Sequence, residues 1–273
     1  MNICPICDSG SSSLFNSKHD KKIFLCINKD CGHFFTPIIK LDQGVCARPE
    51  DLETESDNFM FKFNERNKKL LKLLINSFKK DNQKSKLNLL DYGAGNAHIS
   101  RTFKNELNSK ANIYCVDKNP SCKNLYKKYD LIHIQALDEI NEKIDLIYMI
   151  EVIEHLEDPI KELKRLSKIL KPDGKIFITT PVGRKRENTT NAYDTISHIH
   201  FFTEKSLNLT LKKAGLSEID EYKYFPELYL TTSLKGKIKN FIQNIYKFKF
   251  FERKDSNDNE VGHLVGFTKL SNK

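Results

Sequence analysis

A short glycine turn near the first third of the chain has the residue types and spacing of a ligand-binding loop. An apolar run over residues 87–90 leads into Asp91, and Gly93 and Gly95 follow, one residue apart. Glycine accepts positive φ and lets a ligand approach the backbone, and the helix expected next offers free N–H groups. Dinucleotide-binding loops carry a further glycine where this chain has His98. The acidic Asp91 instead suits a ligand with a positively charged amino group.

A second set of residues could remove a proton or hold a cation. Glu151, Glu154 and His155 stand at i, i+3 and i+4, a spacing that places side chains on one face of a helical turn. We expect His198 to return over the same strand ends. Such a set can bind Mg²⁺ or Mn²⁺, or His155 or His198 can act directly as a general base. We take Glu154, His155 and His198 as catalytic candidates, and His200 as a surface or substrate-contact residue.

Four cysteines near the N-terminus have the spacing of a zinc site. Cys4 and Cys7 form a C-x-x-C pair, and Cys26 and Cys31 follow after a hairpin-length segment. His33 is a reserve ligand. A disulfide is the competing interpretation, which a reducing compartment disfavours. Four cysteines leave no open coordination position, so the zinc is expected to be structural.

The elements that must position these residues alternate between strands and helices. We expect strands at residues 87–90, 111–116, 131–134, 144–149 and 175–180, with helices from His98, over 119–128 and over 159–170. This alternation predicts an α/β fold with a parallel sheet covered by helices on both faces. Ligands bind such sheets at the carboxyl ends of the strands, where Asp91, Asp117 and Glu151 lie.

Four motifs in chain order resemble the class I S-adenosylmethionine (SAM) methyltransferases. They are Asp91-x-Gly93-x-Gly95, residues 144–159 with the pattern E-x-x-E-H-L, residues 170–181, and residues 197–216. The resemblance covers about residues 60–225 and implies a Rossmann-like sheet of seven strands with helices on both faces. One departure is Ala97, where many members carry a third glycine, and we expect the small alanine to be tolerated.

The resemblance assigns the cofactor contacts residue by residue. It implies that Asp91 and the backbone of Gly93 and Gly95 hold the methionine part, that Asp117 holds the ribose, and that Leu137 meets the adenine beside Asp138, while Glu151 faces SAM. Small-RNA 2′-O-methyltransferases and ubiquinone-pathway O-methyltransferases resemble the Glu–His arrangement and use a metal, whereas many relatives carry it without an ion.

Four segments divide the chain. Residues 1–38 are expected to form the zinc-ribbon module, 39–82 an acidic linker and a helix over about 59–78, 83–225 the SAM-binding domain, and 226–273 a C-terminal helix and an edge strand that complete it. The helix, over 233–251, is basic and amphipathic. It could cover the substrate pocket, pack against the domain or make peripheral contact with an anionic membrane.

Composition narrows the setting and the partners. The 273 residues carry a formal net charge of +9, and no apolar run approaches the length of a membrane span. Cys4, Pro5 and Cys7 occupy the place of the apolar region of a secretion signal, so we expect a cytoplasmic protein. The charge favours anionic partners, although a solvated lysine-rich surface would also explain it. Arg184, Lys185 and Arg186 could clamp a phosphate.

These observations predict a SAM-dependent methyltransferase. The zinc module ahead of a SAM domain resembles enzymes of surface-polysaccharide pathways. We therefore expect O-methylation of a sugar or another small polar or phosphorylated intermediate, such as a nucleotide-linked sugar. The alternative is an RNA methyltransferase, of the ribosomal or small-RNA type, disfavoured because lysine is spread along the chain. A non-catalytic SAM-binding module is a third hypothesis, and the intact Glu154, His155 and His198 argue against it.

Overall fold

The computed structural model describes residues 2–17, 21–37, 69–77, 86–107, 110–183, 193, 195, 197–225 and 263–271. The expected acidic linker, the start of the helix at about residue 59, the basic residues after Pro181 and the amphipathic helix over 233–251 lie outside these ranges. The part of the predicted helix that is described, residues 69–76, is helical and buries Leu70, Leu71 and Leu74.

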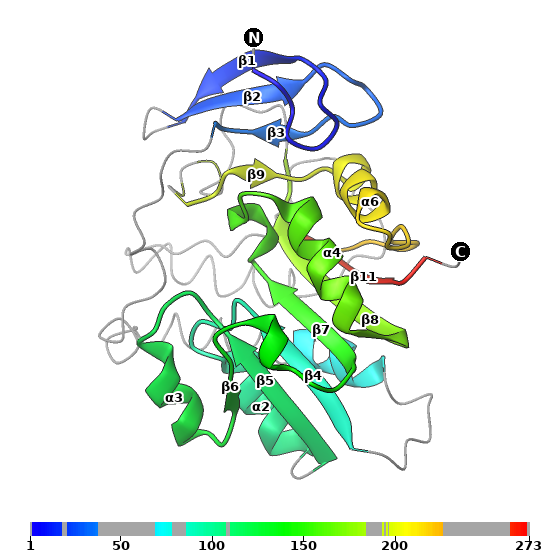
Figure 1. The fold of residues 1–273 in the computed structure, drawn as a ribbon. Helices are drawn as coiled ribbons and strands as arrows, with labels where there is room; N and C mark the ends of the chain where they lie inside the picture. The colour runs from blue at the N-terminus through cyan, green and yellow to red at the C-terminus, as the bar shows by residue number, and fades with distance from the viewer. Residues whose placement is uncertain are drawn as a thin grey trace, which may run out of the picture.

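A seven-stranded sheet forms the centre of the molecule (Figure 1). Its strands, in spatial order, are β10 (Lys223–Phe225), β11 (His263–Lys269), β8 (Leu170–Pro181), β7 (Ile144–Ile150), β4 (Leu87–Tyr92), β5 (Ala111–Val116) and β6 (Ile132–His133). The five strands from β8 to β6 are parallel, and β11 runs antiparallel to both of its neighbours. The prediction of a Rossmann-like sheet of seven strands is confirmed.

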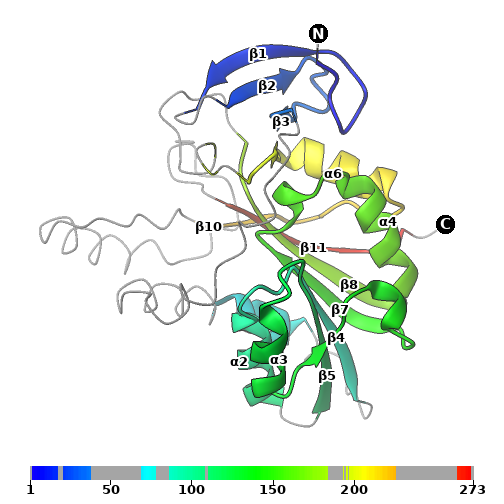
Figure 2. The same cartoon turned by 60° about the vertical axis from the view of Figure 1, so that its left-hand side comes forward.

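Helices cover both faces of the sheet (Figure 2). One face carries α2 (His98–Leu107), α3 (Cys122–Lys128) and the helical residues 69–76, and the other carries α4 (Pro159–Ile169) and α6 (Glu204–Lys213). Alternate residues of β4 point to opposite faces of the sheet. Leu89 packs in the hydrophobic core that includes α2 and α3, and Leu90 packs in the core that includes α4 and α6. Two short 3₁₀ turns, η3 (Leu137–Glu139) and η4 (Ile153–His155), follow β6 and β7.

The N-terminal module builds a second sheet together with a strand from far along the chain. The sheet runs β1 (Ser11–Asn16), β2 (Lys22–Cys26), β3 (Phe34–Phe35) and β9 (His200–Phe201), all antiparallel. The last strand comes from the expected SAM-binding segment, and Figure 1 shows it directly below β3, where the chain leads on to α6. Cys4, Phe24 and Phe35 belong to the same hydrophobic core as the helices α4 and α6. The module is therefore continuous with the larger fold.

Two expectations need correction. The strand near the C-terminus, β11, lies between β8 and β10, so the sheet edge is formed by β10 and not by the expected final strand. Full-length pairing explains the position, because all seven residues of β11 have partners on β8. The strand around 131–134 is shorter than predicted, with only Ile132 and His133 paired to β5. No helix among the described residues is long and apolar enough to cross a membrane.

Candidate active site

The glycine loop after β4 is fixed to the end of the neighbouring strand. The backbone N–H groups of Gly93 and Ala94 both donate to the carbonyl of Val116, at 2.9 and 3.0 Å. Gly93 has φ of +74°, and a Cβ there would lie 2.6 Å from Cγ2 of Val152. Glycine is therefore required at this position for two reasons: its φ is positive, and the Val152 side chain leaves no room for a Cβ. Ala97 also adopts positive φ, at +50°, which suits the third glycine that related loops carry.

Asp91 lies beneath this loop in a buried polar network. Its side chain is part of a residue only 5% exposed, and Oδ2 accepts a hydrogen bond of 2.6 Å from the Ser100 hydroxyl. That hydroxyl lies 2.5 Å from the hydroxyl of Tyr148. Burial raises the pKa of Asp91 to about 7. The carboxyl group therefore changes charge near neutral pH.

Asp117 closes the other side of the loop. Its Oδ2 accepts the N–H of Gly95 at 2.8 Å and its Oδ1 accepts the N–H of Asn119 at 2.8 Å. The hydroxyl of Tyr126 in turn donates to the carbonyl of Gly95. Leu137, at the start of η3, is 7% exposed. The structure thus brings Asp91, near the end of β4, and Asp117, directly after β5, to the same end of two neighbouring strands.

Three of the predicted catalytic side chains converge beyond the end of β7. Oε1 of the fully buried Glu154 lies 4.0 Å from Nε2 of His155 and 3.9 Å from Nε2 of His198. The two imidazole rings meet edge to face, with centroids 4.6 Å apart. The other carboxylate oxygen of Glu154 accepts a bond of 3.0 Å from the hydroxyl of Thr180. The group therefore has one buried carboxylate held in place and two partly exposed imidazoles.

The protonation state of His155 follows from its partners. Nδ1 lies 3.0 Å from the carbonyl of Ser197, which can only accept, so Nδ1 carries the proton. Burial is the largest influence and lowers the pKa of His155, and the charge of Lys21 adds to it. The bond to Ser197 and the charge of Glu151 oppose the shift without reversing it. The ring is therefore neutral at pH 7, with the lone pair of Nε2 directed away from the Ser197 contact. A neutral imidazole with an accessible Nε2 can accept a proton.

Glu151 does not join this group, although its spacing predicted that it would. It lies before the 3₁₀ turn η4 with φ of +57°, so Glu151 and His155 do not share a helical face. Its Oε1 accepts a bond of 2.6 Å from the hydroxyl of Thr179, and its Oε2 lies 2.8 Å from Nδ1 of His263. His263 has no neighbour in the chain that signals this partner, so its contact with Glu151 could not be predicted from the sequence.

The four N-terminal cysteines converge as predicted. The Sγ atoms of Cys4 and Cys31 are 3.8 Å apart, those of Cys7 and Cys26 are 3.4 Å apart, and all four lie within 4.8 Å of one another. Both distances far exceed the ~2.05 Å of a disulfide bond. They match the separation of about 3.8 Å between thiolates that surround Zn²⁺ tetrahedrally at ~2.3 Å.

Two histidines take places that the sequence did not predict. His200, expected at the surface, is 2% exposed, and His33, the reserve zinc ligand, is fully buried. Nε2 of His33 lies 3.0 Å from Nδ1 of His200, and Nε2 of His200 donates to the carbonyl of Leu156. Burial lowers the pKa of His200 to about 4 and holds that of His33 well below its usual range. The pair is therefore a neutral hydrogen-bonded link between the module and the larger domain.

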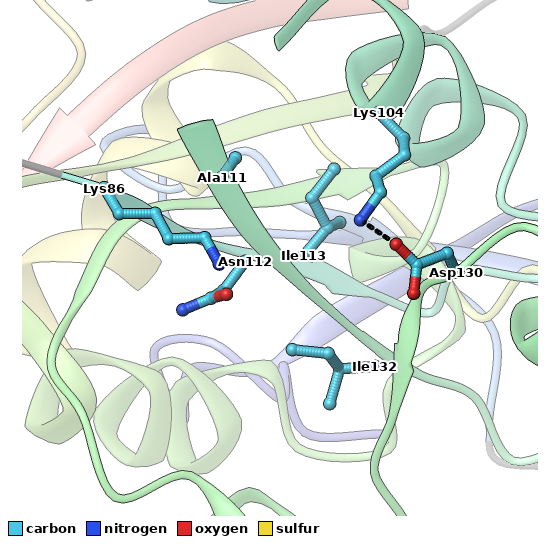
Figure 3. Close-up of a pocket in the computed structure, with 7 residues that line it drawn as sticks. All are labelled: Lys86, Lys104, Ala111, Asn112, Ile113, Asp130 and Ile132. Atoms are coloured by element: carbon cyan, nitrogen blue, oxygen red, sulfur yellow. Dashed lines mark ion pairs between the residues drawn. The ribbon is translucent and has the colours of Figure 1, made fainter. Parts of the chain in front are cut away.

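A separate hollow lies at the amino ends of the parallel strands, opposite to the carboxyl ends that carry the glycine loop (Figure 3). Its volume is about 320 Å³, and it is lined by Lys86, Ala111, Asn112, Ile113 and Ile132, with Lys104 and Asp130 forming an ion pair of 2.5 Å. Ala111, Asn112 and Ile113 form the amino end of β5, and Lys86 directly precedes β4; the other lining residues come from α2, β6 and the turn before β6. The hollow is thus remote from the carboxyl ends where the glycine loop lies, and it takes no part in the site.

The strand order, the single antiparallel strand and the glycine loop define the fold of a class I methyltransferase. Residues 62–221 match the family model described as "Methyltransferase domain". This match spans more than half of the chain, so the chain belongs to that family.

Solved structures show the same fold at low sequence identity. The plantazolicin methyltransferase BamL, in complex with a triazolic desmethylPZN analog and SAH, superposes with a TM-score of 0.53, at 15% identity over 83% of this chain and 92% of that one. A chain from the Haloferax volcanii complex of the Trm112 methyltransferase activator with a methyltransferase gives 0.51, at 14% identity over 70% and 85%.

Curated relatives match over shorter stretches. The tRNA U34 carboxymethyltransferase of Campylobacter curvus is 34% identical over 77 residues, which are 27% of this chain and 26% of the relative. The protein of the same name from Aliarcobacter butzleri is 33% identical over 97 residues, 34% and 32% of the two chains. The chain thus spans about a quarter to a third of the length of these relatives.

Proposed function

We propose that this protein transfers a methyl group from SAM to a hydroxyl of a polar acceptor. The observation that carries the proposal is the convergence of Glu154, His155 and His198 at the same edge of the sheet as the glycine loop. A sulfonium methyl is already activated, so the protein must align the acceptor and remove its proton. A hydroxyl needs such help, because its own pKa lies far above neutral.

The glycine loop is the proposed seat of SAM. Gly95, whose φ is +48°, has open space where a Cβ would stand, which leaves room for a ligand against the backbone. Asp91 would face the ammonium group and Asp117 the ribose, with Leu137 against the adenine. Glu151, held by Thr179 and His263, would border the cofactor on the side of β7.

His155 is the proposed base. It is the most exposed member of its group, with a side chain 33% exposed against 12% for His198 and none for Glu154. Its neutral Nε2 accepts the acceptor proton, and the buried Glu154 carboxylate then stabilises the imidazolium that forms. His198 completes the wall on the other side of Glu154.

The same donor set fits a divalent cation. One carboxylate oxygen and two imidazole nitrogens lie within 4.8 Å of one another, and this mixture of ligands suits Mn²⁺ or a similar ion, with Mg²⁺ also possible at the carboxylate. Glu154, His155 and His198 would hold the ion, and Glu151 would not. Bound there, a cation would lower the pKa of an acceptor hydroxyl.

We also propose that the cysteine cluster holds one structural Zn²⁺. Elemental analysis of the purified protein should find one zinc per chain, and Cys26→Ser should lose it, because a missing ligand opens the tetrahedral site. Cys122→Ser is the matched control, since Cys122 is a buried thiol outside the cluster. Equal zinc content in both variants would contradict the assignment.

The raised pKa of Asp91 gives SAM binding a pH dependence. Below pH 7 the carboxyl is largely protonated and cannot pair with the ammonium, so calorimetry should show SAM binding several-fold tighter at pH 7.5 than at pH 6. Asp91→Asn should weaken binding and remove this slope. Stability should move oppositely, because only the unfolded carboxyl ionises readily between about pH 4 and 7. A slope that persists in Asp91→Asn would refute the role of Asp91.

Two classes of acceptor are proposed, and RNA has the more specific support. The four curated relatives are all named tRNA U34 carboxymethyltransferases, and the net charge of +9 suits a polyanion. These findings favour the RNA alternative over the sugar acceptor that we expected first. The sugar or nucleotide-linked sugar rests on resemblance alone and is retained as the second candidate.

The test is methyl transfer from labelled SAM to unfractionated tRNA. We expect label in tRNA with the wild type and none with Gly93→Arg, whose side chain would fill the cofactor loop. Nuclease digestion then distinguishes label on ribose oxygen from label on a base. If tRNA and total RNA stay unlabelled while a nucleotide-sugar pool accepts the methyl group, the RNA assignment is wrong and the sugar assignment replaces it.

A further inference from the structure

Lys21 is a buried cation that reaches from the N-terminal module into the candidate active site. The residue is 3% exposed, and its Nζ donates to the carbonyls of Thr195 and His198 at 2.7 and 2.8 Å. The ammonium also lies 5.4 Å from the centroid of the Phe201 ring. Burying an ammonium group is costly unless its protons find acceptors. The buried ammonium group of Lys21 therefore holds the backbone at Thr195 and His198.

Further bonds tie the same stretch to the module. We call the described residues 195 and 197–203 the His198 segment. Its strand β9 pairs with β3, and the N–H of Thr36 donates to the carbonyl of Ile199 at 3.1 Å. The hydroxyl of Thr203 donates to the carbonyl of Cys31, one of the four clustered cysteines. The path from the cysteine cluster to the active site is therefore short and continuous.

On its other side the His198 segment contacts the catalytic turn. The N–H of Ile199 donates to the backbone carbonyl of Glu154 at 2.9 Å, and the carbonyl of Ser197 accepts from His155. The segment thus lies between η4 and the module. The backbone around His198 is therefore held from two sides, by η4 and by the module.

We propose that Lys21 is a positioning residue for His198, and that the N-terminal module is a built part of the acceptor half of the active site. Without the ammonium group, the carbonyls of Thr195 and His198 lose their shared donor, and the imidazole of His198 moves out of register with Glu154. The inference rests on the proposed function only for the role of His198 in the reaction. The positional claim concerns the free protein and stands apart from the acceptor.

The experiment compares Lys21→Met with Lys22→Met. Methionine keeps the length of the lysine stem and removes the charge, and Lys22 is the exposed neighbour. Carbethoxylation by diethylpyrocarbonate, located by mass spectrometry, reports the exposure of each histidine. We expect His198 to react at least tenfold faster in Lys21→Met and at the wild-type rate in Lys22→Met. SAM affinity by calorimetry should stay within twofold in both, because the glycine loop is untouched.

A different result is expected if the contacts of Lys21 contribute only to the stability of the fold. Lys21→Met would then have a lower unfolding temperature, but His198 in the folded protein would react at the wild-type rate, and that outcome overturns the proposal. If Lys21→Met fails to fold, Lys21→Gln keeps an N–H donor group without the charge and should give an intermediate rate, whereas a wild-type rate there refutes the proposal equally. Carbethoxylation needs no methyl acceptor, so failure to label RNA would leave this test intact.

Once an acceptor is identified, kcat and the KM for SAM also distinguish a positioning role of Lys21 from a purely structural one. Lys21→Met should lower kcat at least tenfold while the KM for SAM stays within twofold, because the variant displaces His198 and not the cofactor loop. An equal loss in Lys22→Met, or a rise in the KM for SAM alone, would contradict the positioning role.

Discussion

Replacing Glu154 by glutamine should lower the turnover number by about 10²- to 10⁴-fold, the range that a positioned acid–base group contributes. The carboxylate is fully buried between His155 and His198, so the substitution removes the charge that stabilises a protonated imidazole. Glutamine keeps an oxygen that can accept the bond from Thr180. We therefore expect the fold and the SAM affinity to be preserved. His155→Ala should be equally damaging.

Glu142→Gln is the matched control for this prediction. Glu142 is an exposed carboxylate that accepts a bond from Tyr114 at the amino end of β7. It should keep wild-type turnover. If Glu154→Gln and His155→Ala also stay within a few-fold of the wild type, the chemistry lies elsewhere and the site assignment is wrong.

A chelator separates the two versions of this mechanism. With a direct base, a chelator that leaves the cysteine-bound zinc in place has no effect on turnover. With a metal, the same chelator abolishes turnover, and Mn²⁺ or Mg²⁺ restores it. Zinc content must be measured after the treatment, because loss of the structural ion would disturb the module and the His198 segment together.

The second large effect is expected at Gly93. In Gly93→Ala the new Cβ would lie 2.6 and 2.9 Å from the two γ-methyl groups of Val152, and the residue would retain φ near +74°. The branched valine has little rotamer freedom with which to retreat, so the loop itself must move. We expect SAM binding to weaken at least tenfold, which corresponds to about 1.4 kcal/mol, together with a lower unfolding temperature.

Gly215→Ala controls for backbone strain. Gly215 follows the C-cap of α6 with φ of +79°, and no atom lies within 4 Å of the place of its Cβ. Left-handed backbone costs an alanine about 1–2 kcal/mol, so both variants should lose stability. Only Gly93→Ala should lose SAM affinity. Equal dissociation constants for the two variants would show that the cofactor does not contact this loop.

The parallel strands at the centre of the sheet could be predicted from the sequence, because each forms its own continuous apolar run. The continuous apolar runs of β4, β5 and β7 predict buried parallel strands, and their observed ends lie within two residues of the expected ones. The cysteine cluster is predictable for a similar reason, since metal-ligand spacing is a local property of the chain.

The features that could not be predicted depend on contacts between residues that are far apart in the sequence. The strand β9 has only two residues and gains its identity from pairing with β3, more than 160 positions earlier. Lys21 resembles the other basic residues of a chain that holds 45 lysines and arginines. Its role is visible only once the backbone of His198 is placed beside it. The partnership of Glu151 with His263 likewise requires β11 to pair with β8.

One incorrect expectation came from applying helical spacing to a turn. Positions 151, 154 and 155 would share a face on an α-helix, but the chain forms a 3₁₀ turn over Ile153–His155 after a residue with positive φ. Tertiary contacts decide this geometry. The N–H and the side chain of Glu151 are both engaged by Thr179 of the neighbouring strand.

The central claim is that SAM binds at the carboxyl ends of β4 and β5, and calorimetric titration of SAM tests it most directly. The variants to compare are Asp117→Ala, at that end, and Asp130→Ala, an exposed aspartate at the opposite end of the sheet. We expect one SAM per wild-type chain, at least tenfold weaker binding in Asp117→Ala, a loss of about 1.4 kcal/mol, and unchanged binding in Asp130→Ala. Unchanged affinity in Asp117→Ala would contradict this claim.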